Sequence, residues 1–368
     1  MTKKSLPWKK IVQLAAGVSF RKMVLIVAGI SAGMSSPAWA TGTGLYEMHT
    51  DGTVWQYQGG EPCKEGVCSG WLQIRGAGNT YSIAGGGGTG YLALMDNDVN
   101  YFVYNGEPCV GDYCPGWNQI GAYPLSGWAC PGFTFASGLS ASGGTVLAFF
   151  DGATSIFTGG PFALGSSCPW TLIDFNYDEG ASATVGEAGI FEMHWDGSIW
   201  SYPGTPCTDN NYYLNCAGWV QLDGNPNSSS LAIGATSLYE KWQNGAIWKY
   251  TGPPCNSITC PGWVQIGDNP NTSQIAAGGF NMYQTQTDGS IWQFTGQTCN
   301  GNTCSGWVKL DNNPDMAYIV AGQSTVFEVH KSGSIWEYNG TPCNSNGVCS
   351  GWVELDNNAN TNLVVGGF

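Results

Sequence analysis

Hydrophobic and polar residues alternate along the chain in short stretches, and the same alternation returns at a fixed interval from about residue 45 to the C-terminus. Three copies agree closely and stand 44 residues apart; one of them, 326–340, has the sequence Val-Phe-Glu-Val-His-Lys-Ser-Gly-Ser-Ile-Trp-Glu-Tyr-Asn-Gly. The other copies are 45–59, 190–204, 238–252 and 282–296, with degenerate versions at 92–105 and 146–159. This recurrence indicates seven structural repeats.

Each repeat contains four stretches of strand length. In chain order they are a Leu-Tyr-Glu-x-His type, an Ile-Trp-x-Tyr type, a Gly-Trp-Val-x-Leu type and a Gly- and Ala-rich type such as 275–279. We name these strands b, c, d and a. An Asp-Gly, Asn-Gly or Ser-Gly pair joins b to c, and its Gly permits the positive φ of a tight hairpin. We expect strand a to be innermost, because backbones crowd near the axis of a ring of repeats.

Seven four-stranded antiparallel units of this length predict an all-β fold, a seven-bladed β-propeller. The repeat region begins at a strand b, at Leu45, and ends at a strand a, 363–367. We therefore expect one shared blade, with its inner strand from the C-terminal segment and its other three strands from the N-terminal segment. This pairing closes the ring and leaves no free sheet edge. The region 41–368 is predicted to be a single propeller domain stapled by disulfides.

The first 40 residues differ from the repeats. They hold six basic residues, an apolar run from Met23 to about Met34, and then Ser-Ser-Pro-Ala-Trp-Ala at 35–40. This order is typical of a secretory signal peptide, here 1–40, cleaved before Thr41. The alternative is a membrane anchor, but the apolar run is shorter than the ~20 residues that a membrane-spanning helix needs. We predict export to the periplasm, cell surface or extracellular space, with no stable membrane insertion after cleavage.

Charge narrows the range of partners. The chain has 12 Lys and Arg against 26 Asp and Glu. Because six of the basic residues and none of the acidic ones lie in the leader, the remaining chain carries a net charge of −20. Phosphate backbones repel such a chain, so we expect no nucleic-acid partner.

The 14 Cys predict disulfide bonds, which are the default in an exported protein. Twelve form local pairs in the c–d turns, and we also pair Cys130, in an insertion, with Cys168, which occupies the second Cys position of its unit. The local pairs are Cys63 with Cys68, Cys109 with Cys114, Cys207 with Cys216, Cys255 with Cys260, Cys299 with Cys304, and Cys343 with Cys349. Metal binding is the alternative, but each pair supplies two ligands and the chain has only three His. We predict no metal site and no cofactor.

The pattern of polar residues argues against catalysis. An enzyme needs unique groups that converge, whereas here most polar residues recur with the repeat. His49, His194 and His330 occupy one equivalent position in different repeats, so they cannot meet in one site. No catalytic-triad, phosphate-loop or dinucleotide motif is visible. Carboxylates could still meet in the axial channel, which keeps a lyase or hydrolase as a third hypothesis.

Recognition is the chemistry that remains. In strand b, Glu and His two residues apart share one face, and in strand c Trp recurs at one position. A flat indole beside a carboxylate and a ring nitrogen suits a neutral sugar bound between two blades. The predicted sugar-binding residues are Glu47, His49, Trp55, Glu192, His194, Trp200, Glu240, Trp242, Trp248, Gln284, Trp292, Glu328, His330 and Trp336.

Structural interpretations of the same residues stay open. Strand d carries a second recurrent Trp, at 71, 117, 219, 263, 307 and 352, for which we favour packing between blades over binding. The strand c Trp and the strand b Glu could also serve packing. The Asp-Asn-Asn-Pro segments, such as 311–314, could bind calcium, but these residues are also those that turns require.

The strand b, c, d and a motifs quoted above resemble those of the PLL-type bacterial lectins, which are tectonin-related seven-bladed propellers. The resemblance covers essentially all of 45–368. It implies binding of fucose or related, sometimes methylated, glycans in pockets between blades, through the Glu of strand b and the Trp of strand c. Two units depart from the pattern, because Leu94 and Leu147 replace Glu; Tyr101 stands in the Trp region of the first, and no Trp follows in the second. The resemblance therefore implies up to five pockets.

These observations favour a secreted multivalent lectin without catalysis, whose partners are glycans or glycoconjugates and which could form a homo-oligomer. The alternative is a non-catalytic protein-interaction or extracellular structural propeller. Repeated pockets open to solvent would favour the lectin, whereas Trp and Glu buried in blade contacts would favour the alternative. A unique polar cluster at the channel mouth would favour an enzyme.

Overall fold

The computed structural model describes residues 44–85, 92–122, 138–142, 144–150, 153–159, 169–175, 182–209, 214–216, 218–256, 259–301 and 303–366. The predicted leader and the predicted bond between Cys130 and Cys168 lie outside these residues. The described part of the chain contains strands and turns but no helix, and therefore none that could span a membrane.

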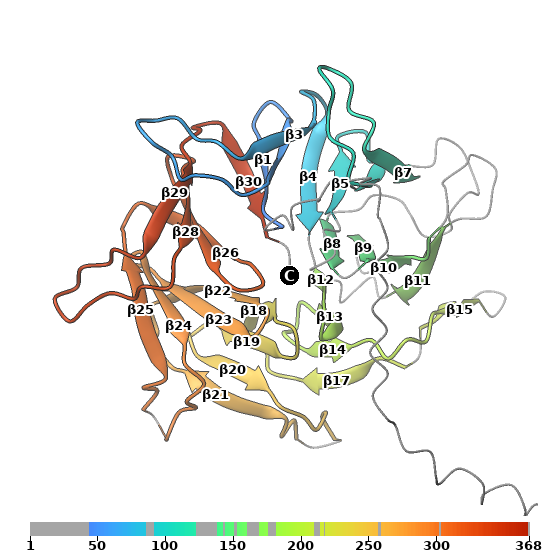
Figure 1. Ribbon diagram of the computed structural model, residues 1–368. Coiled ribbons are helices and arrows are strands. Elements are labelled where there is room, and N and C mark those ends of the chain that lie inside the picture. Colours follow the sequence, from blue (N-terminus) through green and yellow to red (C-terminus); the bar gives the residue numbers. More distant parts are fainter. Residues whose placement is uncertain are drawn as a thin grey trace, which may run out of the picture. The chain divides into compact units, whose positions relative to one another are not determined.

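Seven four-stranded antiparallel sheets form the predicted seven-bladed β-propeller (Figure 1). In every blade the strands lie side by side in the order a, b, c, d. Blade 1 contains β30 (Thr361–Val365), β1 (Tyr46–His49), β2 (Val54–Tyr57) and β3 (Trp71–Arg75), and blade 2 contains β4 (Thr80–Gly85), β5 (Leu92–Asp96), β6 (Tyr101–Tyr104) and β7 (Trp117–Gly121). Blade 3 contains β8 (Gly138–Ser142), β9 (Thr145–Phe150), β10 (Ala153–Phe157) and β11 (Trp170–Phe175), and blade 4 contains β12 (Ser182–Gly186), β13 (Gly189–Met193), β14 (Ile199–Ser201) and β17 (Val220–Asp223).

The other three blades follow the same order. Blades 5 to 7 contain β18 (Ser228–Ile233), β19 (Leu238–Trp242), β20 (Ile247–Tyr250) and β21 (Trp263–Gly267); β22 (Thr272–Gly278), β23 (Asn281–Gln286), β24 (Ser290–Phe294) and β25 (Trp307–Asn312); β26 (Met316–Ala321), β27 (Val326–His330), β28 (Ile335–Tyr338) and β29 (Trp352–Asp356). A small hairpin, β15 (Thr208–Asp209) with β16 (Leu214–Asn215), projects from blade 4. The b–c hairpins turn as predicted, for example through Gly289 with φ of 87°.

Blade 1 is shared between the two ends of the described chain, as predicted. Strand β30 pairs antiparallel with β1, and the register places Tyr46 opposite Val365. Strand a is innermost in every blade (Figure 1). Neighbouring strands a contact one another from β30 through β4 to β26, and the main-chain N–H of Val364 in β30 donates to the Tyr318 hydroxyl in β26 at 2.9 Å. The ring is therefore closed by main-chain hydrogen bonds between segments more than 300 residues apart.

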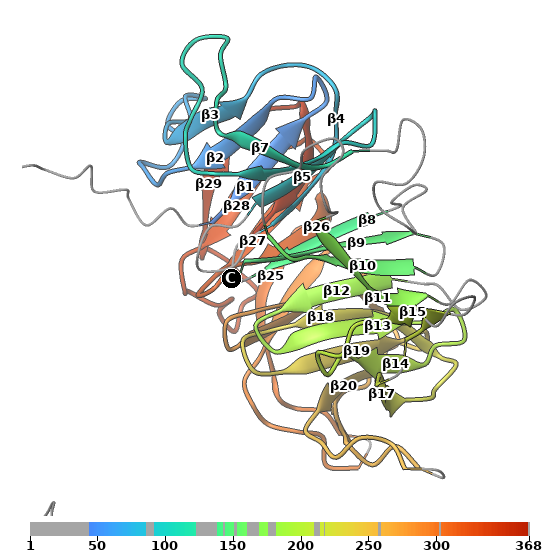
Figure 2. The same ribbon diagram turned by 90° about the vertical axis from the view of Figure 1, so that its right-hand side faces the viewer.

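The hydrophobic core lies between the blades rather than within any one of them. Figure 2 shows β8, β9 and β10 of blade 3 lying over β12 and β13 of blade 4. The described residues form seven apolar clusters, one at each interface between neighbouring blades, including the interface between blades 7 and 1. Strand b is covered on both faces, so β1 is buried along its whole length. A charged residue in strand b is therefore buried unless its neighbours leave an opening.

Six of the predicted disulfides are present, and each closes a c–d turn. They join Cys63 to Cys68, Cys109 to Cys114, Cys207 to Cys216, Cys255 to Cys260, Cys299 to Cys304, and Cys343 to Cys349. In each turn the first Cys also donates its main-chain N–H to a strand d carbonyl of the preceding blade; Cys255, for example, donates to Gln221 at 2.9 Å. The disulfide turns therefore attach the outer edge of each blade to its neighbour, and the described cysteines are structural rather than metal ligands.

Candidate functional sites between the blades

Five blades place an acidic or amide side chain of strand b directly opposite a Trp of strand c. The pairs are Glu47–Trp55, Glu192–Trp200, Glu240–Trp248, Gln284–Trp292 and Glu328–Trp336. The acidic and amide residues are only 0–4% exposed, whereas the five Trp are half-buried. The predicted residues thus come together, but the carboxylates lie inside the contact between blades.

A second aromatic ring, two residues further along strand b, stacks on the strand c Trp in four of these blades. The stacked pairs are His49–Trp55, His194–Trp200 and His330–Trp336, with ring centroids 5.8, 5.9 and 5.6 Å apart, and Trp242–Trp248, at 4.7 Å. Gln286 occupies the position in blade 6. As predicted from the repeat, the three His lie in three different clefts.

The indole N–H of the strand c Trp is held by a hydroxyl two residues earlier in four blades. The bonds run from Trp55 to Thr53, Trp200 to Ser198, Trp292 to Ser290 and Trp336 to Ser334. Blade 5 has Ala246 at the hydroxyl position, and within the described chain the buried Nε1 of Trp248 has no hydrogen-bond partner. The hydroxyl therefore sets the orientation of this Trp in four blades but not in blade 5.

Strand d of the preceding blade adds a second carboxylate to four clefts. Asp356 faces Glu47, and burial together with the charge of Glu47 raises the pKa of Asp356 to about 6. Burial and the charge of Glu192 raise the pKa of Asp174 to about 7. The remaining two pairs are Asp223 with Glu240 and Asp311 with Glu328. Buried carboxylates that face each other favour a shared proton or a cation between them.

The clefts differ in the residue that lies two positions after the strand b acid, and in the pKa values of the groups there. Burial lowers the pKa of His49, but the hydrogen bond and charge of Glu47, 2.9 Å away, outweigh this effect and raise the pKa. In the cleft between blades 4 and 5, Trp242 replaces His, and burial with the charge of Asp223 raises the pKa of Glu240 to about 7. In blade 5 the strand d position holds Gly267, and the next blade has Gln284 instead of Glu. Among the described strands, strand b thus carries a Glu at this position only where strand d of the preceding blade carries an Asp.

The strand d Trp is a packing residue, as we favoured. In all seven blades its Nε1 donates a hydrogen bond of 2.7–3.0 Å to a carbonyl of the preceding blade. The bonds run from Trp71 to Leu355, Trp117 to Ile74, Trp170 to Ile120, Trp219 to Ile173, Trp263 to Leu222, Trp307 to Ile266 and Trp352 to Leu310. Trp170 was missing from the predicted set, because Pro169 replaces the Gly that precedes Trp in the other blades.

The two degenerate blades are apolar at the predicted site. Leu94 and Leu147 are fully buried where other blades carry the carboxylate. The residue opposite Leu94 is Phe102, which follows Leu94 by eight positions just as Trp55 follows Glu47. Tyr101, which the sequence analysis placed in the Trp region, lies one residue earlier and pairs with Met95.

The Asp-Asn-Asn-Pro segments form turns. The Asp311 carboxylate accepts the main-chain N–H of Asn313 at 2.7 Å, and the Asn313 side chain accepts the N–H of Asp315 at 3.0 Å. Asp356 and Asn358 repeat this arrangement after blade 7. Turn formation thus accounts for the composition of these segments.

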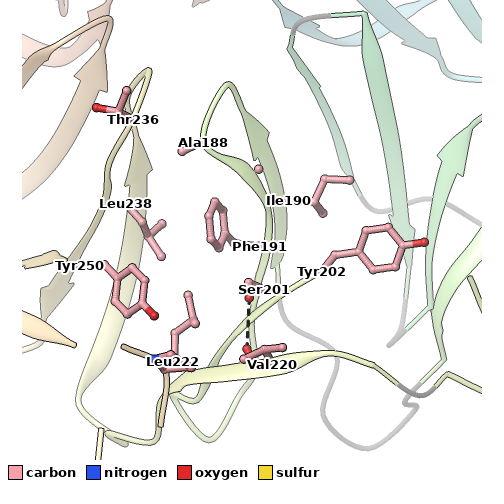
Figure 3. A pocket seen from close by; sticks show the side chains of 12 residues that line it. Ala188, Ile190, Phe191, Ser201, Tyr202, Val220, Leu222, Thr236, Leu238 and Tyr250 are labelled. Atoms are coloured by element: carbon pink, nitrogen blue, oxygen red, sulfur yellow. Dashed lines mark hydrogen bonds between the residues drawn. The ribbon is translucent and has the colours of Figure 1, made fainter. Parts of the chain in front are cut away.

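An open cleft with a volume of about 490 Å³ lies between blades 4 and 5. Phe191, Leu238 and Tyr250 face it, whereas Tyr202 points away toward the preceding blade (Figure 3). Its floor is the buried side chains of Phe191, Leu222 and Leu238, and its rim includes the exposed Thr236 and the hydroxyl of Ser201, which donates to the Val220 carbonyl at 3.4 Å. This cleft could not be predicted from the sequence, because most of its residues are ordinary strand residues that form a shared surface only when two blades meet.

No model of a known protein family matches the chain, and no curated protein sequence matches it. Solved structures of β-propellers are similar to it in fold. Human WBSCR16 shares 13% identity, with 81% of this chain and 87% of that chain covered and a TM-score of 0.50. Prp20p from Saccharomyces cerevisiae, described with its binding to Gsp1p and histones, shares 14% identity over 78% and 80% of the two chains, with a TM-score of 0.49. At these identities the likeness shows the fold alone.

Proposed function

We propose that the protein is a non-catalytic, multivalent carbohydrate-binding protein that acts after export. Two lines support the proposal. The repeat motifs resemble those of PLL-type lectins, which implies fucose or related glycans as ligands. Five blades carry the same pairing of a strand b acid or amide with a strand c Trp, and several weak sites on one ring would give avidity on a glycan-coated surface.

The observation that carries the proposal is the open cleft between blades 4 and 5. Its volume of about 490 Å³ falls within the usual range for small-ligand sites, and its lining combines apolar side chains with a few hydroxyls. The apolar face of a pyranose would lie on the half-buried ring of Tyr250, with the buried Phe191 and Leu238 beneath it. The sugar hydroxyls would then meet Ser201, Thr236 and the Tyr250 hydroxyl at the rim.

A protein-interaction or extracellular structural propeller is the second candidate. The burial of Glu47, Glu192, Glu240 and Glu328 favours it, because buried carboxylates in blade contacts are what purely structural repeats would show. Under the carbohydrate proposal these groups support the stacked rings from beneath. Direct sugar contact by the strand b and strand c residues stays a prediction.

A blocking substitution tests the proposal at the cleft. Thr236→Trp fills the rim from an exposed turn, so it should leave the fold intact while it reduces retention on fucose-conjugated agarose. Ser345→Trp, at an exposed position of the Cys343–Cys349 turn, is the matched control and should bind like the unaltered protein. Equal retention by all three proteins would remove the cleft from the proposal, and absence of retention by the unaltered protein would remove fucose.

A further inference from the structure

We propose that Asp174, Glu192 and His194 bind one divalent transition-metal ion of the Zn²⁺ class between blades 3 and 4. Asp174 lies in β11, the outer strand of blade 3. Glu192 lies in β13, and His194 directly follows that strand in blade 4. One ligand atom from each of the three residues lies within 4.8 Å of the other two. No other group of three or more such side chains in the described chain meets this condition.

Distances within this cleft differ from those in the two equivalent clefts. His194 Nε2 lies 3.6 Å from Glu192 Oε2, whereas the corresponding atoms are 2.9 Å apart for His49 and Glu47 and 2.8 Å apart for His330 and Glu328. The shorter values are those of direct hydrogen bonds. A tetrahedral ion with ligand bonds of 2.0–2.1 Å separates its ligand atoms by ~3.4 Å. Of the three described clefts that contain a His, only the Asp174 cleft therefore has the spacing of two ligands around an ion.

Burial gives the site an acceptor that needs a partner. Glu192 is 4% exposed, and its Oε1 has no N–H or hydroxyl donor in the described chain, so a proton shared with Asp174 or a bound cation is what can satisfy it. The other oxygen faces His194, and Asp174 adds a second carboxylate from the neighbouring blade. Two carboxylates in a buried setting repel each other, and a doubly charged cation between them neutralises both charges.

The ligand types select the class of ion. One imidazole and two carboxylates suit Zn²⁺ and similar transition metals, whereas Ca²⁺ and Mg²⁺ prefer oxygen ligands throughout. Three protein ligands leave one position of a tetrahedral site for water or for an external ligand. No metal site was predicted from the sequence, because each Cys pair supplies two ligands and the chain has only three His, which lie in different repeats. It could not foresee that strand d of one blade brings an Asp to the Glu and His of the next.

Calorimetric titration of metal-stripped protein with ZnCl₂ tests the site. We expect one saturable Zn²⁺ site per chain, and at least a 100-fold loss of affinity in Glu192→Gln and in His194→Gln. Glu192→Gln should fold, because blade 6 carries Gln284 at the equivalent position. His330→Gln, which alters the equivalent cleft between blades 6 and 7, is the matched control and should retain the Zn²⁺ affinity of the unaltered protein.

Co²⁺ provides a readout that does not depend on the variants. The unaltered protein should give visible d–d absorption bands without thiolate charge-transfer bands, because the proposed ligands are nitrogen and oxygen. Absence of a saturable Zn²⁺ or Co²⁺ site in the unaltered protein would overturn the proposal. An equal loss of affinity in His330→Gln and His194→Gln would overturn it as well. Because sugar retention is measured at a different cleft, failure here leaves the proposed function standing.

Discussion

Trp71 donates a hydrogen bond of 2.9 Å from its indole Nε1 to the carbonyl oxygen of Leu355, which lies 284 positions later in the chain. Trp71 is in blade 1 and Leu355 is in blade 7, so this bond crosses the interface at which the ring closes. Every other blade makes the same bond to its predecessor. One repeated side chain therefore fixes the spacing of the outer strands around the whole propeller.

Replacing Trp71 by Phe should destabilise the protein by about 1–3 kcal/mol, because the Leu355 carbonyl loses its donor inside a packed interface. Denaturation by urea measures this change. Leu72→Ala, which truncates a partly exposed side chain on the same strand, should cost less. An unchanged midpoint in Trp71→Phe would show that the hydrogen bond adds nothing to the interface.

In blade 5 a hydrogen bond can be added rather than removed. Ala246→Ser should stabilise the protein by about 1 kcal/mol, because it supplies the Trp248 Nε1 with the hydroxyl acceptor that four other blades have. The gain should vanish when Trp248 is also replaced by Phe, since the donor is then gone. A double-mutant cycle measured by thermal unfolding checks the coupling. An equal gain in both backgrounds would show that the hydroxyl acts on something other than the indole.

Glu240 predicts a pH dependence of stability. Its pKa of about 7 in the folded chain lies above the ordinary value of 4.5, so the folded state holds a proton that the unfolded state has released between these pH values. Stability therefore falls as pH rises through this window. Glu240→Gln should lack this loss of stability. The free energy of unfolding of the variant, relative to that of the unaltered protein, should therefore be higher at pH 8 than at pH 4.5 by on the order of 2 kcal/mol. Unfolding curves at the two pH values measure it.

Blade 6 supplies the reciprocal test of this pH effect. There Gln284 accepts a hydrogen bond of 2.9 Å from the Thr272 hydroxyl at the equivalent position. Gln284→Glu should destabilise the protein more at pH 8 than at pH 4.5, because it introduces a buried carboxyl group. If stability depended on pH in the same way in the unaltered protein and in both variants, the raised pKa of Glu240 would not be the cause of the pH dependence.

Removal of residues 361–368 should open the ring. It deletes β30 and with it the inner strand of blade 1, which leaves the edge of β1 unpaired and exposes the cluster around Val364. The loss should approach the whole stability of a domain, about 5–15 kcal/mol, and should appear as aggregation or non-cooperative melting. Deletion of residues 367–368 alone leaves β30 intact and should have little effect. A truncated protein that melts like the full chain would contradict closure by β30.

The sequence predicted the parts of the fold that depend on local patterns. The Asp-Gly and Asn-Gly pairs located the b–c hairpins, and the repeat that begins at strand b and ends at strand a predicted the shared blade. The period of two placed Glu47 and His49 on one face, where they are hydrogen-bonded. The six short-range disulfides were found in the same way, because each pair lies within one turn. These relationships hold within one strand or one repeat, so the order of residues is sufficient to find them.

Relationships between blades could not be predicted in the same way. The approach of Asp174 to Glu192 depends on how strand d of one blade meets strand b of the next, and no periodicity along the chain encodes that distance. The burial of Glu240 is of the same kind, because strand b is covered on both faces only after the blades pack. Trp170 escaped notice for a local reason, since its repeat has lost the preceding Gly.

A glycan-array screen of residues 41–368, with the disulfides formed, is the direct test of carbohydrate binding. We expect a group of hits that share one terminal sugar and that millimolar free monosaccharide displaces. No binding at high protein concentration would contradict the carbohydrate proposal. The clefts between blades would then be interfaces for packing, and the protein an interaction or structural propeller.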